Sequence, residues 1–253
     1  MADSGYDTKE VRDVLGSLKF IPLIPFNKRN TKDTQKINKM PKKDRDVVMK
    51  AVKRNGAALR HVSEELRNDR EIIMKAVTNN RDALEHASKE LRKDRDVVMA
   101  AVTQNGFTLQ FASEDLKNDK AIVMASVTQN GDALQYASKE LRNDRDVVAA
   151  AVTKNSEELQ FASAERRNDR DVVMKAVTKN GFTLRFASEE LKNNKAIVMA
   201  AVRQNGNVLA FASKELRNDK DIVTRAVIQN HNARLYASDK LKNERDIVAI
   251  MRR

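Results

Sequence analysis

Apolar residues recur along most of the chain with a period of 25 residues. In the first full unit, residues 44–68, Val47, Val48, Ala51 and Val52 stand at i, i+1, i+4 and i+5, the spacing of one face of an α-helix. A polar residue, almost always acidic, comes before this stripe in every unit, at Asp44, Asp69, Asp94, Asp119, Asp144, Asp169, Asn194, Asp219 and Glu244. The pattern predicts eight full units from 44 to 243 and the start of a ninth.

Within one unit, the sequence predicts two helices and a short return. Asp44 is a suitable N-cap for the first helix, because its carboxylate can accept hydrogen bonds from the free N–H groups of the first turn. Asn55 and Gly56 tolerate a left-handed conformation and are expected to end this helix after about three turns. Leu59 then begins a shorter helix, and Ser63 is expected to cap one further turn.

Two columns of apolar residues are expected to form a continuous core. The first helix carries Val52, Val77, Val102, Val127, Val152, Val177, Val202 and Val227, and the second carries Leu59, Leu84, Leu109, Leu134, Leu159, Leu184 and Leu209. In the last unit, Arg234 holds the leucine position and leucine moves to Leu235. A 25-residue unit cannot bury its own apolar face, whereas stacked neighbours can. We therefore predict an all-α fold, an α-solenoid of eight to nine stacked 25-residue two-helix repeats.

The repeated pattern Asn-Asp-Arg-Asp-Val-Val, Ala-Val, Asn-Gly and Leu-Gln-Phe-Ala-Ser resembles a helical repeat family catalogued as a domain of unknown function, number forty-one sixteen. The resemblance covers residues 44 to about 250. It implies a repetitive α-helical architecture. It implies no activity, ligand or catalytic residue.

The first 43 residues have a different composition, with all three prolines of the chain. We therefore predict a boundary between a segment 1–43, containing a short helix and an extended stretch, and an array 44–253. Residues 1–30, with the run Phe20–Arg29, resemble a fragment of a DDE transposase of the insertion-sequence-four type. By that resemblance Asp3 matches a metal-binding aspartate. Two-metal chemistry needs several carboxylates. The first aspartate and the final glutamate of the transposase triad have no counterpart in the repeats, so we expect a catalytically inactive remnant.

Composition excludes several classes of protein. The chain has no cysteine, so it forms no disulfide, thiolate zinc site or iron–sulfur cluster. No apolar stretch approaches the roughly 18 to 20 residues of a membrane span, and the N-terminus lacks the features of a secretory signal. We expect a soluble protein without cofactor or metal, in the cytoplasm or exported without a classical signal peptide.

Three polar columns carry candidate chemistry, and each has a structural explanation. The asparagines are expected to end helices through hydrogen bonds to free carbonyls, and the serines to form turns or caps. His61 and His86 replace aromatic residues and are expected to pack rather than bind metal, while His231 replaces the turn glycine and is expected to be exposed. The asparagine and serine columns comprise Asn55, Asn80, Asn105, Asn130, Asn155, Asn180, Asn205 and Asn230, and Ser63, Ser88, Ser113, Ser138, Ser163, Ser188, Ser213 and Ser238.

Basic residues form two further columns. One follows the capping position, at Arg45, Arg70, Arg95, Lys120, Arg145, Arg170, Lys195, Lys220 and Arg245, and the other comprises Arg67, Arg92, Lys117, Arg142, Arg167, Lys192, Arg217 and Lys242. A repeated ridge of positive charge can follow a phosphate backbone, and the net charge is +12. Acids alternate with these bases, however, and residues 44–253 hold 38 basic and 31 acidic groups, which is typical of a solvated, salt-bridged surface. Phe107 and Phe182 are the aromatic candidates for base stacking outside the aromatic column.

No set of residues qualifies as a catalytic, cofactor-binding or metal site. We predict a non-enzymatic scaffold with a protein or peptide partner. The first alternative is a nucleic-acid-associated protein. Two further alternatives are an active transposase and a decayed gene product without a function. Variation along three columns marks possible contact positions or a lack of constraint: Lys50, Lys75, Ala100, Ala125, Ala150, Lys175, Ala200 and Arg225; Ala57, Asp82, Phe107, Asp132, Glu157, Phe182, Asn207 and Asn232; and Arg60, Glu85, Gln110, Gln135, Gln160, Arg185, Ala210 and Leu235.

Overall fold

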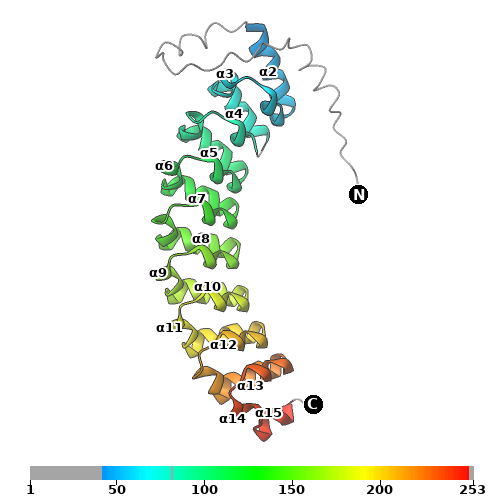
Figure 1. Cartoon of the computed structure of the whole chain (residues 1–253), viewed down its shortest axis with the longest axis vertical. Helices are drawn as coiled ribbons and strands as arrows, with labels where there is room; N and C mark the ends of the chain where they lie inside the picture. The colour runs from blue at the N-terminus through cyan, green and yellow to red at the C-terminus, as the bar shows by residue number, and fades with distance from the viewer. Residues whose placement is uncertain (1–41, 81, 251–253) are drawn as a thin grey trace, which may run out of the picture. The chain divides into compact units, whose positions relative to one another are not determined.

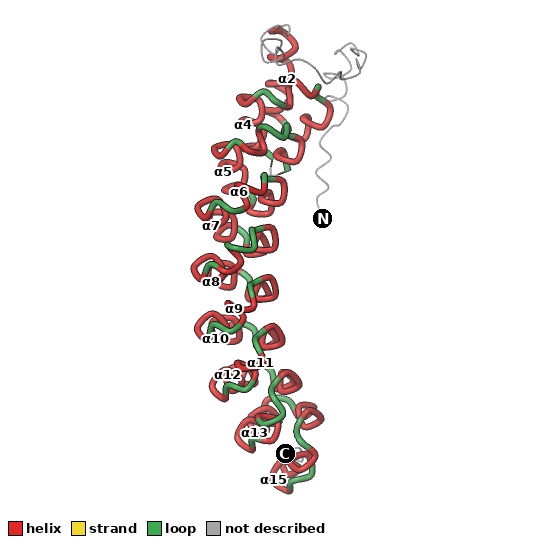
Figure 2. The backbone as a smooth tube through the Cα atoms, turned by 60° about the vertical axis from the view of Figure 1, so that its left-hand side comes forward, coloured by secondary structure: helices red, strands yellow, loops and turns green. Residues whose placement is uncertain are grey.

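The computed structural model describes residues 42–80 and 82–250, and these residues form helices joined by loops, without a strand (Figure 2). The chain divides into two compact units, unit 1 at Met1–Leu116 and unit 2 at Lys117–Arg253. The boundary that the sequence predicts, between residues 43 and 44, differs from this division. It stays a prediction because residues 1–41 lie outside the described part of the chain.

The first helix of each repeat forms as predicted and spans ten residues in its regular form. The cap Asp94, for example, accepts hydrogen bonds at its Oδ1 from the N–H groups of Asp96 and Val97, both at 3.0 Å. At the first repeat the prediction is wrong, because the helix begins at Lys42 and Asp44 therefore lies inside its first turn. These helices are α2 Lys42–Arg54, α4 Arg70–Asn79, α5 Arg95–Gln104, α7 Lys120–Gln129, α8 Arg145–Lys154, α10 Arg170–Lys179, α12 Lys195–Gln204, α13 Lys220–Gln229 and α15 Arg245–Ile250.

The second helix of each repeat is a 3-10 helix. The sequence predicts a short helix here but does not distinguish a 3-10 helix from an α-helix. The hydrogen bonds of this helix join residues three apart, as from Thr108 N–H to the Asn105 carbonyl and from Ala112 N–H to the Leu109 carbonyl, which is the 3-10 pattern. These helices are η3 Gly56–His61, η4 Ala83–His86, η6 Gly106–Phe111, η7 Gly131–Tyr136, η9 Ser156–Phe161, η10 Gly181–Phe186, η11 Gly206–Phe211 and η13 His231–Tyr236.

The predicted turn after each serine is also present, as a single turn of α-helix or 3-10 helix. Ser163 Oγ, for example, accepts a hydrogen bond from the N–H of Arg166 at 3.1 Å. These turns are α3 Glu64–Arg67, η5 Leu91–Lys93, α6 Glu114–Lys117, η8 Leu141–Asn143, α9 Ala164–Arg167, α11 Glu189–Lys192, η12 Leu216–Asn218 and α14 Asp239–Lys242.

The asparagine and glycine after the first helix act differently from the prediction. No described residue has a positive φ. Asn180 is extended, and its Oδ1 accepts a hydrogen bond from the N–H of Phe182 at 3.0 Å, so it caps the 3-10 helix rather than binding free carbonyls. Gly181 is needed for close packing, because a Cβ there would lie 2.5 Å from the carbonyl oxygen of Ala201 in the next repeat.

Stacking of successive repeats builds the core of each unit, and it confirms the all-α solenoid architecture within them. In unit 1, α2, α4 and α5 pack in chain order, as do η3, η4 and η6; unit 2 continues in the same manner with α7, α8, α10, α12, α13 and α15, and with η7, η9, η10, η11 and η13 (Figure 1). The valine and leucine columns are buried as predicted. At roughly 25 cal/mol per Å² of apolar surface, this burial is the main stabilising contribution.

Candidate functional site

At most positions, the basic column after the capping position joins one repeat to the next. In unit 2, Arg145 Nε lies 2.8 Å from Asp169 Oδ2, and Arg145 Nη2 lies 2.6 Å from Asp171 Oδ2. The same residue that caps a helix therefore also receives the cation of the preceding repeat. Further pairs of this kind join Arg45 to Asp69 and Glu71, Arg70 to Asp94 and Asp96, Lys120 to Asp144 and Asp146, Lys195 to Asp219 and Asp221, and Lys220 to Glu244 and Asp246.

These ion pairs agree with the salt-bridged surface that the alternating charges predicted for the basic columns. The hydrogen bond from Arg70 holds the pKa of Asp94 below its usual value, so both partners stay charged at neutral pH and their fields largely cancel at a distance. The second basic column is half-buried, and Arg67 and Arg92 donate to the backbone carbonyls of Arg60 and Ala87. Part of the positive charge therefore joins successive repeats, and part of it forms bonds within single repeats.

The serine column adds another bond between repeats. Ser163 Oγ donates to Asn143 Oδ1 of the preceding repeat at 2.5 Å, and its backbone N–H donates to the carbonyl of Arg142 at 2.9 Å. Equivalent serine-to-asparagine bonds occur at Ser88–Asn68, Ser138–Asn118, Ser188–Asn168, Ser213–Asn193 and Ser238–Asn218. The predicted capping role is confirmed for Ser88, Ser138, Ser163, Ser188, Ser213 and Ser238, and each also makes an inter-repeat bond that the sequence pattern did not indicate; Ser63 makes no side-chain cap hydrogen bond.

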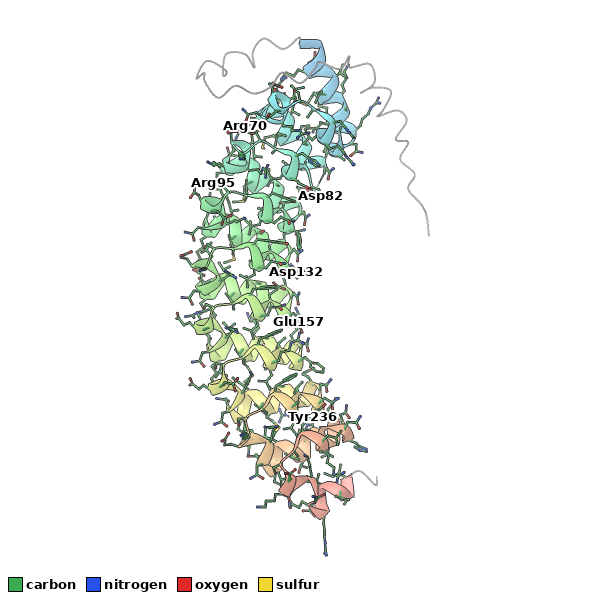
Figure 3. The ribbon with its side chains drawn as sticks, in the orientation of Figure 1. Arg70, Asp82, Arg95, Asp132, Glu157 and Tyr236 are labelled. Carbon is green, nitrogen blue, oxygen red and sulfur yellow. The ribbon has the colours of Figure 1, made fainter. Side chains whose placement is uncertain are left out.

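The variable columns of the 3-10 helices form a surface on a different side from the ion pairs. In unit 1, Asp82 lies on the opposite side from Arg70 and Arg95, and in unit 2, Asp132, Glu157 and Tyr236 lie along one side (Figure 3). We call the unit 2 surface the 3-10 face; its residues are half-buried or exposed and comprise Asp132, Glu157, Phe182, Asn207, Asn232, Gln135, Gln160, Arg185, Ala210, Leu235, Tyr136, Phe161, Phe186, Phe211 and Tyr236.

The middle of the 3-10 face contains aromatic and charged groups in contact with one another. Phe182, 36% exposed, meets Phe211 of the next repeat edge to face with 6.3 Å between ring centroids. The Arg185 guanidinium lies 4.4 Å from the ring centroid of Phe186, and its Nη2 lies 2.6 Å from Glu157 Oε2. Aromatic rings with adjacent charged groups provide contact area and directional bonds, which are the means by which proteins bind peptides.

The last complete repeat presents an apolar part of the 3-10 face. Arg234, at the leucine position, donates from Nε to the carbonyl of Lys242 at 2.6 Å, and Leu235 is 66% exposed. Tyr236 is 38% exposed, and Ile228, on the adjoining end of α13, is 54% exposed. The displaced leucine predicted from the sequence therefore lies on the surface rather than in the core.

The histidines do not come together as a site. His61 is exposed, which contradicts a packing role, while His86 is half-buried and burial lowers its pKa. His231 is exposed, as predicted. Among residues 42–80 and 82–250, no group of three or more His, Cys, Asp or Glu is placed to hold a metal ion.

One unusual residue was not recognised from the sequence. Glu158 is 3% exposed and occupies a buried column that elsewhere holds alanine, threonine or valine. The signal was visible in the aligned repeats: Ala58, Ala83, Thr108, Ala133, Thr183, Val208 and Ala233 are all small, and Glu158 is the single acid among them.

The stacked two-helix repeats and their inter-repeat bonds define an α-helical repeat protein. The family described as Domain of unknown function (DUF4116) matches residues 44–92, 94–142, 122–167, 144–192, 169–217 and 194–242, and the chain belongs to this family. Each match spans about two repeats. No curated protein and no solved structure matches the chain.

The transposase resemblance of residues 1–30 stays a prediction. These residues lie outside the described part of the chain, and the family matches begin at residue 44. None of the described helices is long and apolar enough to cross a membrane.

Proposed function

We propose that the chain is a non-enzymatic repeat protein that binds a protein or peptide partner along the 3-10 face of unit 2. The observation that carries this proposal is that constant and varying positions of the repeat lie in different places. The constant columns are used inside the array, for the core, the helix caps and the bonds between repeats. Two of the three columns that change from repeat to repeat lie on the 3-10 helices and share one exposed or half-buried side.

The chemistry of the 3-10 face favours a peptide over a small molecule. The face extends over successive repeats, so an extended segment can contact several of them in turn. Its aromatic rings and exposed Leu235 suit apolar side chains, while Arg185, Glu157 and the glutamines Gln135 and Gln160 provide hydrogen-bonding groups. Interfaces of this composition usually depend on a few aromatic and arginine residues.

The test is capture of partners from the native cell on the immobilised full chain, with and without nuclease. We expect a partner to survive nuclease treatment and to be lost with the double variant Arg185→Ser, Leu235→Ser. The control is Arg170→Ser, an exposed arginine at the start of α10 and outside the 3-10 face, which is expected to retain the partner. Equal capture by both variants would disprove binding along this face.

A nucleic-acid partner is the alternative, and it rests on the net charge of +12. The ion pairs of the basic column weaken it, because those cations already have carboxylate partners. This alternative predicts association that is lost on nuclease treatment and weakens steeply with salt. A cytoplasmic location is part of the proposal, and fractionation of the native cell tests it.

A further inference from the structure

Glu158 brings an ionisable group into the buried column of the 3-10 helices in unit 2. The residues at its position in the two neighbouring repeats, Ala133 and Thr183, are 0% exposed. The buried Thr183 hydroxyl has a hydrogen-bond partner within its own repeat, because it donates to the carbonyl of Asn180 at 2.7 Å. An ionised Glu158 side chain cannot donate to the corresponding carbonyl of Asn155 in the same way, because a carboxylate has only acceptors.

The Glu158 carboxyl shares one hydrogen-bond donor with a second acid from the preceding repeat. Asn155 Nδ2 lies 2.7 Å from Asp132 Oδ1 and 3.3 Å from Glu158 Oε1. Glu158 Oε2 is buried and has no hydrogen-bond partner. Two carboxyl groups on η7 and η9 thus meet at one amide, with fewer donors than two buried anions require.

The next junction shows how the same array satisfies an acid when a cation is present. There Glu157 receives a hydrogen bond from Asn180 Nδ2 at 2.8 Å and an ion pair from Arg185 at 2.6 Å. The residue that corresponds to Arg185 one repeat earlier is Gln160, which is neutral. Asp132 and Glu158 therefore lack the cation that Glu157 has.

The remaining charged groups on the elements packed against η9 are engaged elsewhere or exposed. On α10, Lys179 Nζ donates to the carbonyls of Thr153 and Lys154, and on α9, Arg166 pairs with Glu165 and Asp169. Lys154, at the end of α8, is exposed. The charged groups bearing on Glu158 are consequently the two carboxylates Asp132 and Glu157.

We propose that Glu158 and Asp132 share a proton across the junction between η7 and η9, and that loss of this proton loosens the junction. With Glu158 protonated, its O–H can donate to Asp132, and only one negative charge remains. When the proton leaves, two carboxylates face each other with Asn155 as the shared donor. Separation of η9 from η7 then relieves the repulsion and admits water to Glu158 Oε2. Independently of any partner, this makes one junction of unit 2 respond to pH.

The expected transition lies close to neutral pH. Burial is the main cause that raises the pKa of Glu158, to about 8, and the negative charge of Asp132 is the second. A proton is the fitting ligand because Glu158 Oε2 is enclosed, so a larger cation does not reach it without opening the junction.

Hydrogen–deuterium exchange of the full chain tests the proposal, with each peptide corrected for the intrinsic pH dependence of exchange. Between pH 6 and pH 9 we expect protection over residues 131–161 to fall by about tenfold or more. Peptides over 206–236, where the buried column holds Val208 and Ala233, serve as the internal reference and should show no comparable fall. Glu158→Gln should abolish the fall, while Glu85→Gln, at an exposed acid of η4, should not alter it.

Protection over 131–161 that is independent of pH in the unmodified chain would overturn the proposal, as would an undiminished fall in Glu158→Gln. If that variant does not fold, Glu158→Thr carries the same measurement, because threonine stands at this position in the next repeat. Titration of the glutamate side-chain carboxyl carbons by nuclear magnetic resonance needs no variant. One resonance should titrate near pH 8; if all midpoints lie in the ordinary range for glutamate, near 4.3, there is no shared proton.

Discussion

Two adjacent repeats, 144–168 and 169–193, have the same order of helices and the same serine-to-asparagine bond to the preceding repeat, but they differ at several polar positions. The first has Ser156 and Glu158 where the second has Gly181 and Thr183. The basic residue of the first, Arg145, reaches two acids in the next repeat. That of the second, Arg170, is followed by Asn194 and Ala196 at the corresponding positions. The comparison shows that the apolar columns maintain the repeat, while the polar positions can change at single junctions.

The largest effect should fall equally on the two repeats. Leu159 and Leu184 are both 0% exposed in the same column, so Leu159→Ala and Leu184→Ala should each lower the free energy of unfolding by about 2–5 kcal/mol. Urea denaturation measures both. Leu235→Ala, at the exposed leucine of the last repeat, is the control and should cost under about 1 kcal/mol. If one of the two core substitutions lowered the free energy of unfolding much less than the other, the two repeats would not be equivalent in their packing.

The second effect separates the two repeats by pH. An unfolded glutamate titrates near 4.5, whereas folded Glu158 titrates near 8. Between these values the folded chain holds a proton that the unfolded chain has released, so this residue lowers stability as pH rises from about 4.5 to about 8, with no further change above. Relative to the unmodified chain, Glu158→Thr should therefore gain on the order of 3 kcal/mol between pH 5 and pH 9.

Denaturation of both proteins at the two pH values measures this gain. The reciprocal change, Thr183→Glu, places an acid in the neighbouring repeat and should introduce a fall of the same sign. Parallel pH profiles for Glu158→Thr and the unmodified chain would show that Glu158 ionises normally.

The third effect concerns the close approach at the glycine position. Gly181→Ser would place a Cβ 2.5 Å from the Ala201 carbonyl oxygen, and the resulting displacement should cost about 1–3 kcal/mol. Ser156→Gly removes a Cβ that its own junction already accommodates, so the change should stay within about 1 kcal/mol. Equal costs for the two substitutions, measured by urea denaturation, would mean that the junctions do not differ in spacing.

The smallest effect compares the two basic residues. Arg145→Ala removes ion pairs to Asp169 and Asp171, and should cost roughly 0.2–1 kcal/mol at low salt and less at high salt. Arg170→Ala should have no measurable cost, because the following repeat offers no acid at the corresponding positions. Denaturation at two salt concentrations distinguishes them, and a salt-dependent loss at Arg170 would contradict the proposed pairing pattern.

Much of the fold could be predicted because the repeat period exposes each column of the structure. The caps at Asp94 and its equivalents, the buried valines and leucines and the turn after each serine all followed from local chemistry. The 3-10 geometry did not, because α and 3-10 helices of six residues place their apolar residues similarly. The role of Gly181 was also missed, since its constraint comes from Ala201 in another repeat.

The candidate surface was partly visible in the sequence. Three varying columns were recognised, but the structure was needed to show that two of them share the 3-10 face, whereas the third, from Lys50 to Arg225, lies on the first helices of the repeats. Alternating charges in the sequence favoured a salt-bridged surface, but the partners were not identified: Arg145 pairs with Asp169 and Asp171, which lie 24 and 26 residues away. Residues 24 and 26 positions apart do not contact each other within one helix. They meet here only because successive repeats stack, and the sequence does not give the distance between repeats.

The amino-acid sequence alone determined the repeat, its length, the helix starts after the first repeat and the buried columns, because these depend on periodicity and on hydrogen bonds between residues close in the chain. Tertiary structure decided which charges are paired, why a glycine is required and that Glu158 and Asp132 meet. Such features depend on the distance between repeats, and a carboxyl group is chemically the same on the surface and in the core until its neighbours are in place.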